Sequence, residues 1–174
     1  DNFVLGRREH LEDALKSDRF SLHDFDLLDL SKLDDFFASE DIDVVFHLAA
    51  NSDIREGTRS TDRDLQSTFM TTFNVLECMR QHAVKKLLFT STPAIFGEHE
   101  EALHEETPAR PESLYGASKL SAEAFIMAFS GLYDIQAWIC RLSNIVGERS
   151  THGIILDLLN KLDLDKEELE VLGD

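Results

Sequence analysis

The chain has 174 residues, of which 43% are hydrophobic, enough to form the core of one domain. Acidic residues outnumber basic residues by 34 to 17, which gives a net charge of −17, and such a surface repels nucleic acids and anionic membranes. We therefore expect neither as a partner, and an anionic substrate would have to be held locally by backbone N–H groups and a few arginines.

Two cysteines, Cys78 and Cys140, lie in separate apolar stretches. We expect them to be small core residues in a reducing compartment rather than a disulfide pair. No apolar run reaches the length of a membrane span and no signal peptide is evident, so a cytoplasmic location is expected. The seven histidines lack metal-ligand spacing, so no metal is expected, and His47, inside an apolar run, is predicted to be a core histidine.

Short apolar runs alternate with amphipathic stretches along the chain. In chain order, we predict a weak strand around Arg19 to Phe25, a short helix over 31–39, strands over 43–50, 85–92 and 135–144, and helices over 68–84 and 115–133. The helix over 68–84 is indicated by apolar residues spaced by three and four positions, namely Phe69, Phe73, Leu76 and Met79. The alternation of continuously apolar strands with helices predicts an α/β fold with a parallel sheet flanked by helices.

In such sheets the ligand site lies beyond the carboxyl ends of the strands. The segments 49–53, 90–98 and 143–153 each follow a predicted strand and are polar or small. We therefore expect all three to converge on one crevice, near the first half of the long helix over 115–133.

That helix carries Tyr115 and Lys119 in the stretch "YGASK". Four residues are about one helical turn, so the two side chains would lie on the same face. A lysine beside a phenol could support proton transfer, whereas a solvated helix start explains the same spacing without any chemistry. The pair alone does not decide between these interpretations.

Four segments of the chain resemble, in order and separation, four successive blocks of the extended short-chain dehydrogenases/reductases. They are "VVFHLAAN", "FTSTPAIFGE", "SLYGASKLSAEAF" and "RLSNIVGERSTHG". The resemblance is to the NAD-dependent sugar-nucleotide epimerases and dehydratases, and within them to UDP-glucose 4-epimerase-like proteins. It implies a Rossmann-like, doubly wound parallel sheet, NAD as cofactor and a nucleotide sugar as substrate.

The same resemblance predicts that the chain is part of a longer enzyme. The Gly-rich turn of the family, which holds the dinucleotide pyrophosphate at a helix N-terminus, would lie upstream of Asp1, together with the first two strands. We therefore expect residues 1–174 to form a partial, truncated NAD(P)-binding Rossmann-like domain without the C-terminal substrate-binding portion. The chain alone is expected to bind NAD weakly and to be inactive.

By resemblance, Tyr115 is the general acid and base for a sugar hydroxyl, and the sugar passes through a transient 4-keto form. A free phenol has a pKa of about 10, and the charges of Lys119 and of a nicotinamide ring would favour the phenolate. Thr92 would hydrogen-bond the same sugar oxygen, and Asn144 is expected to contact substrate. Both Thr92 and Asn144 also fit ordinary strand-end chemistry.

The cofactor contacts are likewise implied by the resemblance. Asp1 is expected to bind the adenosine ribose, and Asp26 to lie beside the adenine. The full predicted set is Asp1, Asn2, Asp26, Leu27, Leu48, Ala49, Ala50, Asn51, Ser91, Tyr115 and Lys119. Two positions depart from the family: Phe96 replaces a frequent tyrosine, and Thr68 replaces a frequent cofactor-contacting asparagine.

The residues after Thr92 separate the reactions of the family. Its 4,6-dehydratases place an Asp-Glu pair there, because elimination of water needs a further acid and base, and the related decarboxylases keep the glutamate. Pro93 and Ala94 cannot exchange protons, which favours a UDP-glucose/UDP-galactose 4-epimerase. The alternatives are another NAD-dependent nucleotide-sugar dehydratase or reductase, or a non-catalytic dinucleotide-binding protein.

Members of the family commonly form homodimers through two helices of each subunit. Here these would be the helices near 62–83 and 115–132, and a homodimer is expected on that basis. A core-facing apolar stripe would explain the composition of both helices equally well.

Overall fold

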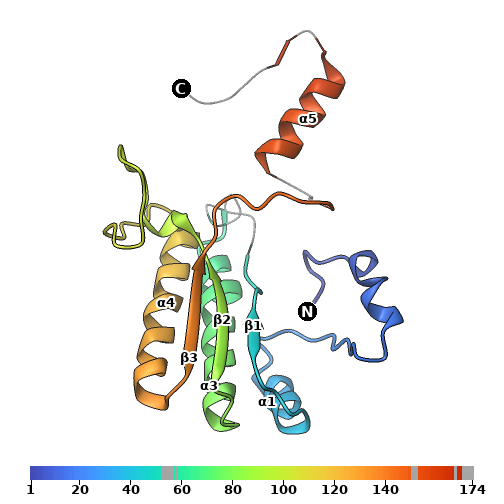
Figure 1. Cartoon of the computed structure of the whole chain (residues 1–174), viewed down its shortest axis with the longest axis vertical. Helices are drawn as coiled ribbons and strands as arrows, with labels where there is room; N and C mark the ends of the chain where they lie inside the picture. The colour runs from blue at the N-terminus through green and yellow to red at the C-terminus, as the bar shows by residue number, and fades with distance from the viewer. Residues whose placement is uncertain (52–56, 58, 150–152, 167, 170–174) are drawn as a thin grey trace. The chain divides into compact units, whose positions relative to one another are not determined.

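The computed structural model describes residues 1–51, 57, 59–149, 153–166 and 168–169. These residues form two compact units, Asp1–Leu142 and Ser143–Asp174. The first unit contains a three-stranded sheet and its helices, and the second contains one helix (Figure 1).

The sheet of the first unit is parallel throughout. Its strands are β1 (Val45–His47), β2 (Lys86–Ser91) and β3 (Gln136–Arg141), in the spatial order β1-β2-β3. Phe46 pairs with Leu88, and Leu88 pairs with Trp138. Each crossover between strands passes through a helix, as parallel pairing requires. The predicted parallel sheet flanked by helices is therefore confirmed.

Three α-helices pack with the sheet in the first unit: α1 (Leu30–Ser39), α3 (Thr71–Gln81) and α4 (Leu114–Tyr133). Polar caps fix where two of them begin: Asp29 accepts from the N–H of Lys32, and Ser113 accepts from that of Gly116. Helix α4 ends at Asp134, which adopts the left-handed conformation typical of helix C-termini. A π-helical segment, η3 (Leu65–Met70), leads directly into α3.

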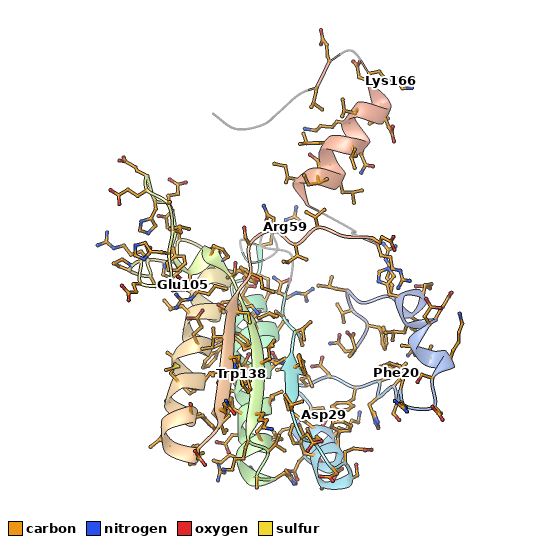
Figure 2. All side chains as sticks on the ribbon, viewed as in Figure 1. Phe20, Asp29, Arg59, Glu105, Trp138 and Lys166 are labelled. Atoms are coloured by element: carbon orange, nitrogen blue, oxygen red, sulfur yellow. The ribbon has the colours of Figure 1, made fainter. Side chains whose placement is uncertain are left out.

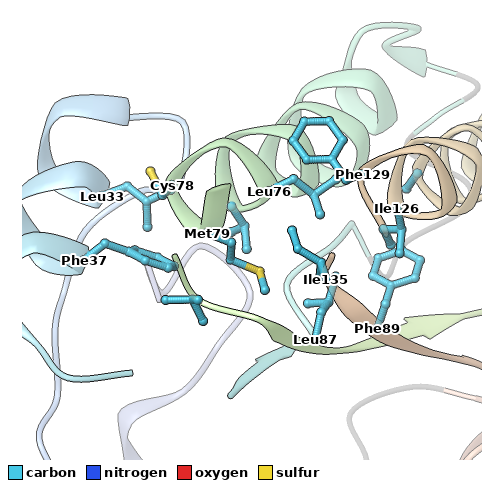
Figure 3. Packing of buried hydrophobic residues seen from close by; sticks show 13 residues of the cluster. Leu33, Phe37, Leu76, Cys78, Met79, Leu87, Phe89, Ile126, Phe129 and Ile135 are labelled. Atoms are coloured by element: carbon cyan, nitrogen blue, oxygen red, sulfur yellow. The ribbon is translucent and has the colours of Figure 1, made fainter. Parts of the chain in front are cut away.

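The core lies between one face of the sheet and these helices (Figure 3). Leu87 and Phe89 of β2 are fully buried and alternate with less buried neighbours, as the period of a strand requires. Their partners come from all three helices and are Leu33, Phe37, Leu76, Cys78, Met79, Ile126 and Phe129. The predicted core positions Phe69 and Phe73 are partly buried and pack against this cluster.

The opposite face of the sheet carries the row Phe46, Leu88 and Trp138 (Trp138 is labelled in Figure 2). Phe46 is 61% exposed and Trp138 is 43% exposed. In the part of the chain that the structure describes, this row is therefore far less covered than the core face.

The strand predicted around Arg19 to Phe25 is not present. A strand needs a hydrogen-bonded neighbour, and among the described residues β1 pairs with β2 alone. Phe25 instead packs beside Phe36 of α1, with ring centroids 5.9 Å apart. Two short 3-10 turns, η1 (Arg8–Leu11) and η2 (Ala14–Lys16), precede this segment.

The predicted strands are shorter than expected at their carboxyl ends. β1 ends at His47 rather than at Ala50, and β3 ends at Arg141 rather than at Asn144. At the end of β1, the backbone leaves the sheet at Leu48 to Asn51, which line a cleft described below.

The second unit contains α5 (Ile154–Leu164). Several of its apolar side chains are exposed, among them Ile154 and Leu159. Within the described ranges, none of the helices combines the length and the apolar character needed to cross a bilayer.

Candidate active site

Tyr115 and Lys119 lie one turn apart on α4, and both contact the carboxyl end of β2. The ammonium group of Lys119 donates to the carbonyl oxygen of Thr90 at 2.6 Å. The hydroxyl of Thr92 lies close enough to the Tyr115 phenol to affect its pKa. The structure thus brings together the three residues predicted to be catalytic, Tyr115, Lys119 and Thr92.

A short 3-10 turn, η4 (Pro93–Ile95), keeps Thr92 in this position. Thr92 caps the turn by accepting from the N–H of Ala94 at 3.2 Å. The start of α4 approaches the same turn so closely that a Cβ atom on Gly116 would lie 2.4 Å from the carbonyl oxygen of Ala94. Glycine beside Tyr115 therefore allows the helix to bring the phenol to Thr92.

Burial dominates the electrostatics of the pair. It raises the pKa of Tyr115, the nearby Thr92 hydroxyl opposes this increase, and the Asp64 carboxylate adds to it. Burial also lowers the pKa of Lys119 to about 8, against an opposing effect of Glu123. Burial is the largest cause of the Tyr115 shift, and the ammonium group of Lys119 is bonded to the Thr90 carbonyl, so a lowering of the phenol pKa by Lys119 and a nicotinamide ring stays a prediction.

A buried polar cluster lies between β1 and η3. Asp64 is fully buried, and one of its carboxylate oxygens accepts from the side-chain amide of Asn51 at 2.9 Å. The other oxygen has no hydrogen-bond partner among the described residues. The N–H of Asn51 donates to Thr68 at 3.2 Å, so the threonine that replaces the family asparagine holds the turn after β1.

A cleft of about 680 Å³ lies beside this cluster. It is lined by the N-terminal segment, the loop at 25–28, the turn after β1 and several residues between 60 and 71. Eight of the predicted cofactor contacts are among its lining residues, namely Asp1, Asn2, Asp26, Leu27, Leu48, Ala49, Ala50 and Asn51. Residues up to 50 positions apart in sequence therefore meet at this cleft, and their contact with a cofactor stays a prediction.

Local hydrogen bonds orient the polar residues of the cleft. Asn2 donates through its side chain to Asp26 at 2.8 Å, and Asp26 also accepts from the N–H of Leu28 at 2.8 Å. The side-chain amide of Asn74 donates to the carbonyl oxygen of Leu27 at 2.9 Å, which ties the loop to α3. One wall of the cleft is thus anchored to the core through a helix.

Several lining residues were not predicted, namely Ser60, Asp62, Arg63, Gln66, Ser67 and Thr71. Arg63 is the one arginine among the described residues that line the cleft. Its spacing from Gln66, Ser67 and Thr71 is helical, so a shared face was recognisable in principle. No sequence motif, however, indicated that this face of the helix would line the cleft.

Other predicted contacts lie elsewhere. Ser91 is buried and donates to Glu123 rather than lining the cleft, and Tyr115 and Lys119 are not among the lining residues either. Asn144 is exposed in the second unit, and its contact with substrate stays a prediction. Residues 52–53 and 150–152 of the predicted crevice segments lie outside the described residues.

His47 is a core histidine, as predicted. It is 3% exposed, and its Nε2 atom lies 3.0 Å from the hydroxyl of Thr72. Burial lowers its pKa to about 4, and the charge of Lys119 acts in the same direction. The cysteines are both free thiols; Cys78 is buried and Cys140 is half-buried.

The parallel sheet and its crossover helices together define a Rossmann-like domain. The chain belongs to the NAD dependent epimerase/dehydratase family, whose sequence model matches residues 2–174. The family expected from the sequence is thereby confirmed.

Individual relatives support the same assignment. A dTDP-glucose 4,6-dehydratase of Neisseria meningitidis is 28% identical over 97% of this chain and 51% of its own length. The crystal structure of UDP-glucose 4-epimerase from Thermotoga maritima with UDP-glucose has a TM-score of 0.86 and 26% identity, covering 100% of this chain and 57% of that one. The Thermus thermophilus UDP-glucose 4-epimerase complex with NAD has a TM-score of 0.80 and 30% identity, covering 88% and 49%. The chain therefore spans about half the length of these proteins.

Proposed function

We propose that the intact protein is an NAD-dependent 4-epimerase of a nucleotide sugar, of the UDP-glucose/UDP-galactose type. The observation that carries the proposal is that Tyr115 lies beside Thr92, while Lys119, on the next turn of the same helix, is bonded to the neighbouring Thr90 carbonyl. Binding alone does not require such a proton-transfer group, so a purely dinucleotide-binding role is the weaker interpretation. The structures with UDP-glucose and with NAD from Thermotoga and Thermus support the choice of substrate class and cofactor.

The cleft fits a dinucleotide in its chemistry. Asp1 and Asp26 supply carboxylates that can accept hydrogen bonds from ribose hydroxyls, and Ala49 and Ala50 leave the backbone open to a ligand. Arg63 adds a positive charge to a wall that would meet an anionic group. When bound, NAD would accept a hydride from the sugar carbon and return it.

Tyr115 would accept the proton of the sugar hydroxyl during oxidation and return it during reduction. Its phenol pKa lies above the ordinary value, so proton uptake at neutral pH needs additional positive charge near the hydroxyl. Lys119 supplies one such charge from one turn away, and an oxidised nicotinamide ring would supply a second. Thr92 would hold the same sugar oxygen through its hydroxyl.

The residues of η4 favour epimerisation over dehydration. Pro93 and Ala94 follow Thr92 directly, and neither side chain can donate or accept a proton. Water elimination would need such groups beside the sugar. Because a dehydratase is nevertheless among the relatives, the experiment must separate the two products.

The test is to supply the full-length protein with UDP-glucose or UDP-galactose and NAD, and to follow interconversion by chromatography. Tyr115→Phe is expected to lower turnover by about 100-fold or more, whereas Tyr133→Phe, at the other end of α4, is expected to leave it unchanged. Accumulation of a 4-keto-6-deoxy sugar would point to a dehydratase instead. Absence of turnover with any nucleotide sugar, or an unaltered Tyr115→Phe enzyme, would contradict the proposal.

We further propose that the protein forms a homodimer through α3 and α4, and that it is cytoplasmic. Phe125 of α4 is 40% exposed and packs edge-to-face on Phe69, with ring centroids 4.9 Å apart. Apolar surface therefore continues from one helix to the other, which suits a four-helix interface. Phe125→Arg is expected to give a monomer in sedimentation velocity, with Lys86→Ala at the exposed start of β2 as a control.

A further inference from the structure

Three consecutive residues at the end of β2 contact three residues of α4 that lie one turn apart. The pairs are Thr90–Lys119, Ser91–Glu123 and Thr92–Tyr115. Two of these pairs contain the residues to which proton chemistry has been assigned. The third pair, Ser91–Glu123, has no role in that chemistry so far.

Glu123 is only 5% exposed, and both of its carboxylate oxygens accept hydrogen bonds. Its Oε1 atom accepts from the hydroxyl of Ser91 and from Nε of Arg141 at 3.1 Å, and its Oε2 atom accepts from Nη2 of Arg141 at 2.8 Å. This bidentate geometry is the strong form of an ion pair. Arg141 also donates to the carbonyl oxygen of Glu105 at 2.8 Å, so Glu123 joins α4 to β2, β3 and the loop before α4.

We propose that Glu123, held by Arg141 and Ser91, is a positioning residue that sets α4 against β2 so that Lys119 reaches the Thr90 carbonyl and Tyr115 reaches Thr92. The inference rests on the proposed function, because it assigns a purpose to the site of that function. Glu123 acts through the catalytic group and touches no substrate.

A contribution to the stability of the fold does not by itself explain why the buried Glu123–Arg141 ion pair is present. Replacing such a pair by apolar residues of similar volume is often neutral or stabilising, because desolvation offsets the attraction. The pair is however directional. Its two parallel hydrogen bonds fix both the rotation of α4 and its position along β3, and the bond from Ser91 ties the same carboxylate to β2. An apolar contact would let the helix slide.

Glu123 also contributes charge at the active site. It lies one turn beyond Lys119 and opposes the loss of its proton. The titratable and charged groups around this part of the site are His47 on β1, Asp64 before η3, Tyr115 and Glu123 on α4, and Arg141 on β3. His47, with a pKa of about 4, is neutral at physiological pH and adds no positive charge, whereas the negative charge of Glu123 favours the protonated form of Lys119.

Glu123→Gln keeps the size of the side chain but removes its charge. We expect the titration midpoint of Lys119 to fall by about one pH unit, and the alkaline limb of the activity profile to move to lower pH with it. We also expect kcat to fall by about 10- to 100-fold with little change in KM, because the site loses alignment and not binding. Glu77→Gln, which breaks the Glu77–Arg80 ion pair on α3, is the matched control and is expected to change neither quantity.

The experiment follows the Lys119 side chain by NMR in full-length protein labelled with 13C at lysine Cε, with the signal assigned through Lys119→Met. An unchanged Lys119 midpoint in Glu123→Gln would overturn the inference, whatever the activity. If the wild-type protein turns over no nucleotide sugar, the proposed function fails, while the NMR result still decides the role of Glu123.

A second variant keeps the test decisive if Glu123→Gln fails to fold. Glu123→Gln/Arg141→Gln removes both buried charges and leaves neither unpaired. A positioning role predicts that this variant folds with near-normal stability but keeps the lowered kcat, because the alignment of α4 is still lost. Full recovery of kcat by the double variant would show that the pair is merely structural and would overturn the inference.

Discussion

The ammonium group of Lys119 donates a hydrogen bond of 2.6 Å to the carbonyl oxygen of Thr90. The same nitrogen lies 4.6 Å from the centre of the Phe89 ring, which adds a cation–π contact. A backbone dipole and a ring face satisfy this buried cation only in part, which is why its pKa is lowered to about 8. Burying the charge of Lys119 costs free energy, and charges buried at such a cost are typical of functional sites.

Lys119→Met is expected to change how stability depends on pH. The folded pKa of Lys119 is about 8 and the unfolded value about 10.4, so the unfolded chain binds more protons between these values. The free energy of unfolding of the wild type therefore rises with pH in this window, by up to about 3 kcal/mol. The variant should lack the rise, as measured by urea denaturation at several pH values.

Lys16→Met is the control for that experiment, because Lys16 is an exposed residue of the N-terminal segment. It removes a positive charge without emptying a buried site. A rise of equal size in Lys119→Met and in the wild type would contradict the burial of a charged ammonium group at this position.

Two glycines of α4 form a matched pair for a test of the contact with η4. A Cβ atom on Gly116 would lie 2.4 Å from the carbonyl oxygen of Ala94, whereas one on Gly131 would meet nothing within 4 Å. We expect Gly116→Ala to destabilise the fold by about 1 to 3 kcal/mol through overpacking and to lower activity by moving Tyr115. Gly131→Ala should stabilise the fold by about 0.5 to 1 kcal/mol.

Thermal unfolding of both variants decides this prediction. Equal effects at the two positions would show that helix propensity alone governs them. In that case η4 would shift to make room for the added Cβ atom, and the close approach at Gly116 would not hold Tyr115 in place.

The helices and strands around the active site were predictable because their signals are local. Apolar spacing marked α3 and α4, and β2 is an apolar run that ends in hydroxyl residues. The joint position of Tyr115 and Lys119 follows from helical geometry alone. The convergence of Thr92 on Tyr115 followed from the rule that parallel strands end at the same edge of the sheet.

The remaining features depend on contacts between distant segments. The segment at Arg19–Phe25 has apolar residues suited to a strand, but pairing needs a neighbour that its own sequence cannot reveal. Glu123 and Arg141 lie 18 residues apart and carry no motif, so only the folded arrangement identifies them as partners. The raised phenol pKa of Tyr115 has the same origin, because burial is a property of the whole fold.

His47 should make the protein sensitive to acid. Its folded pKa is about 4 and its unfolded value about 6.5, so the unfolded chain binds more protons between these values. Stability should therefore fall as the pH drops from 6.5 to 4, by up to about 3 kcal/mol from this residue. His47→Gln should lose this part of the decline in urea denaturation, while His104→Gln, in an exposed loop, should keep it.

Cys78 should be unreactive in the folded protein although it is a free thiol. Burial raises its pKa to about 11, and the carboxylates of Asp34 and Glu77 act in the same direction, so the reactive thiolate is scarce at neutral pH. Ellman's reagent at pH 7.5 should therefore react in the Cys78→Ala variant at the wild-type rate, through the half-buried Cys140, and barely react in Cys140→Ala until urea is added. Rapid labelling of native Cys140→Ala would mean that α3 opens readily around Cys78, and the core in which Cys78 packs against Leu33 would then be less stable than its burial indicates.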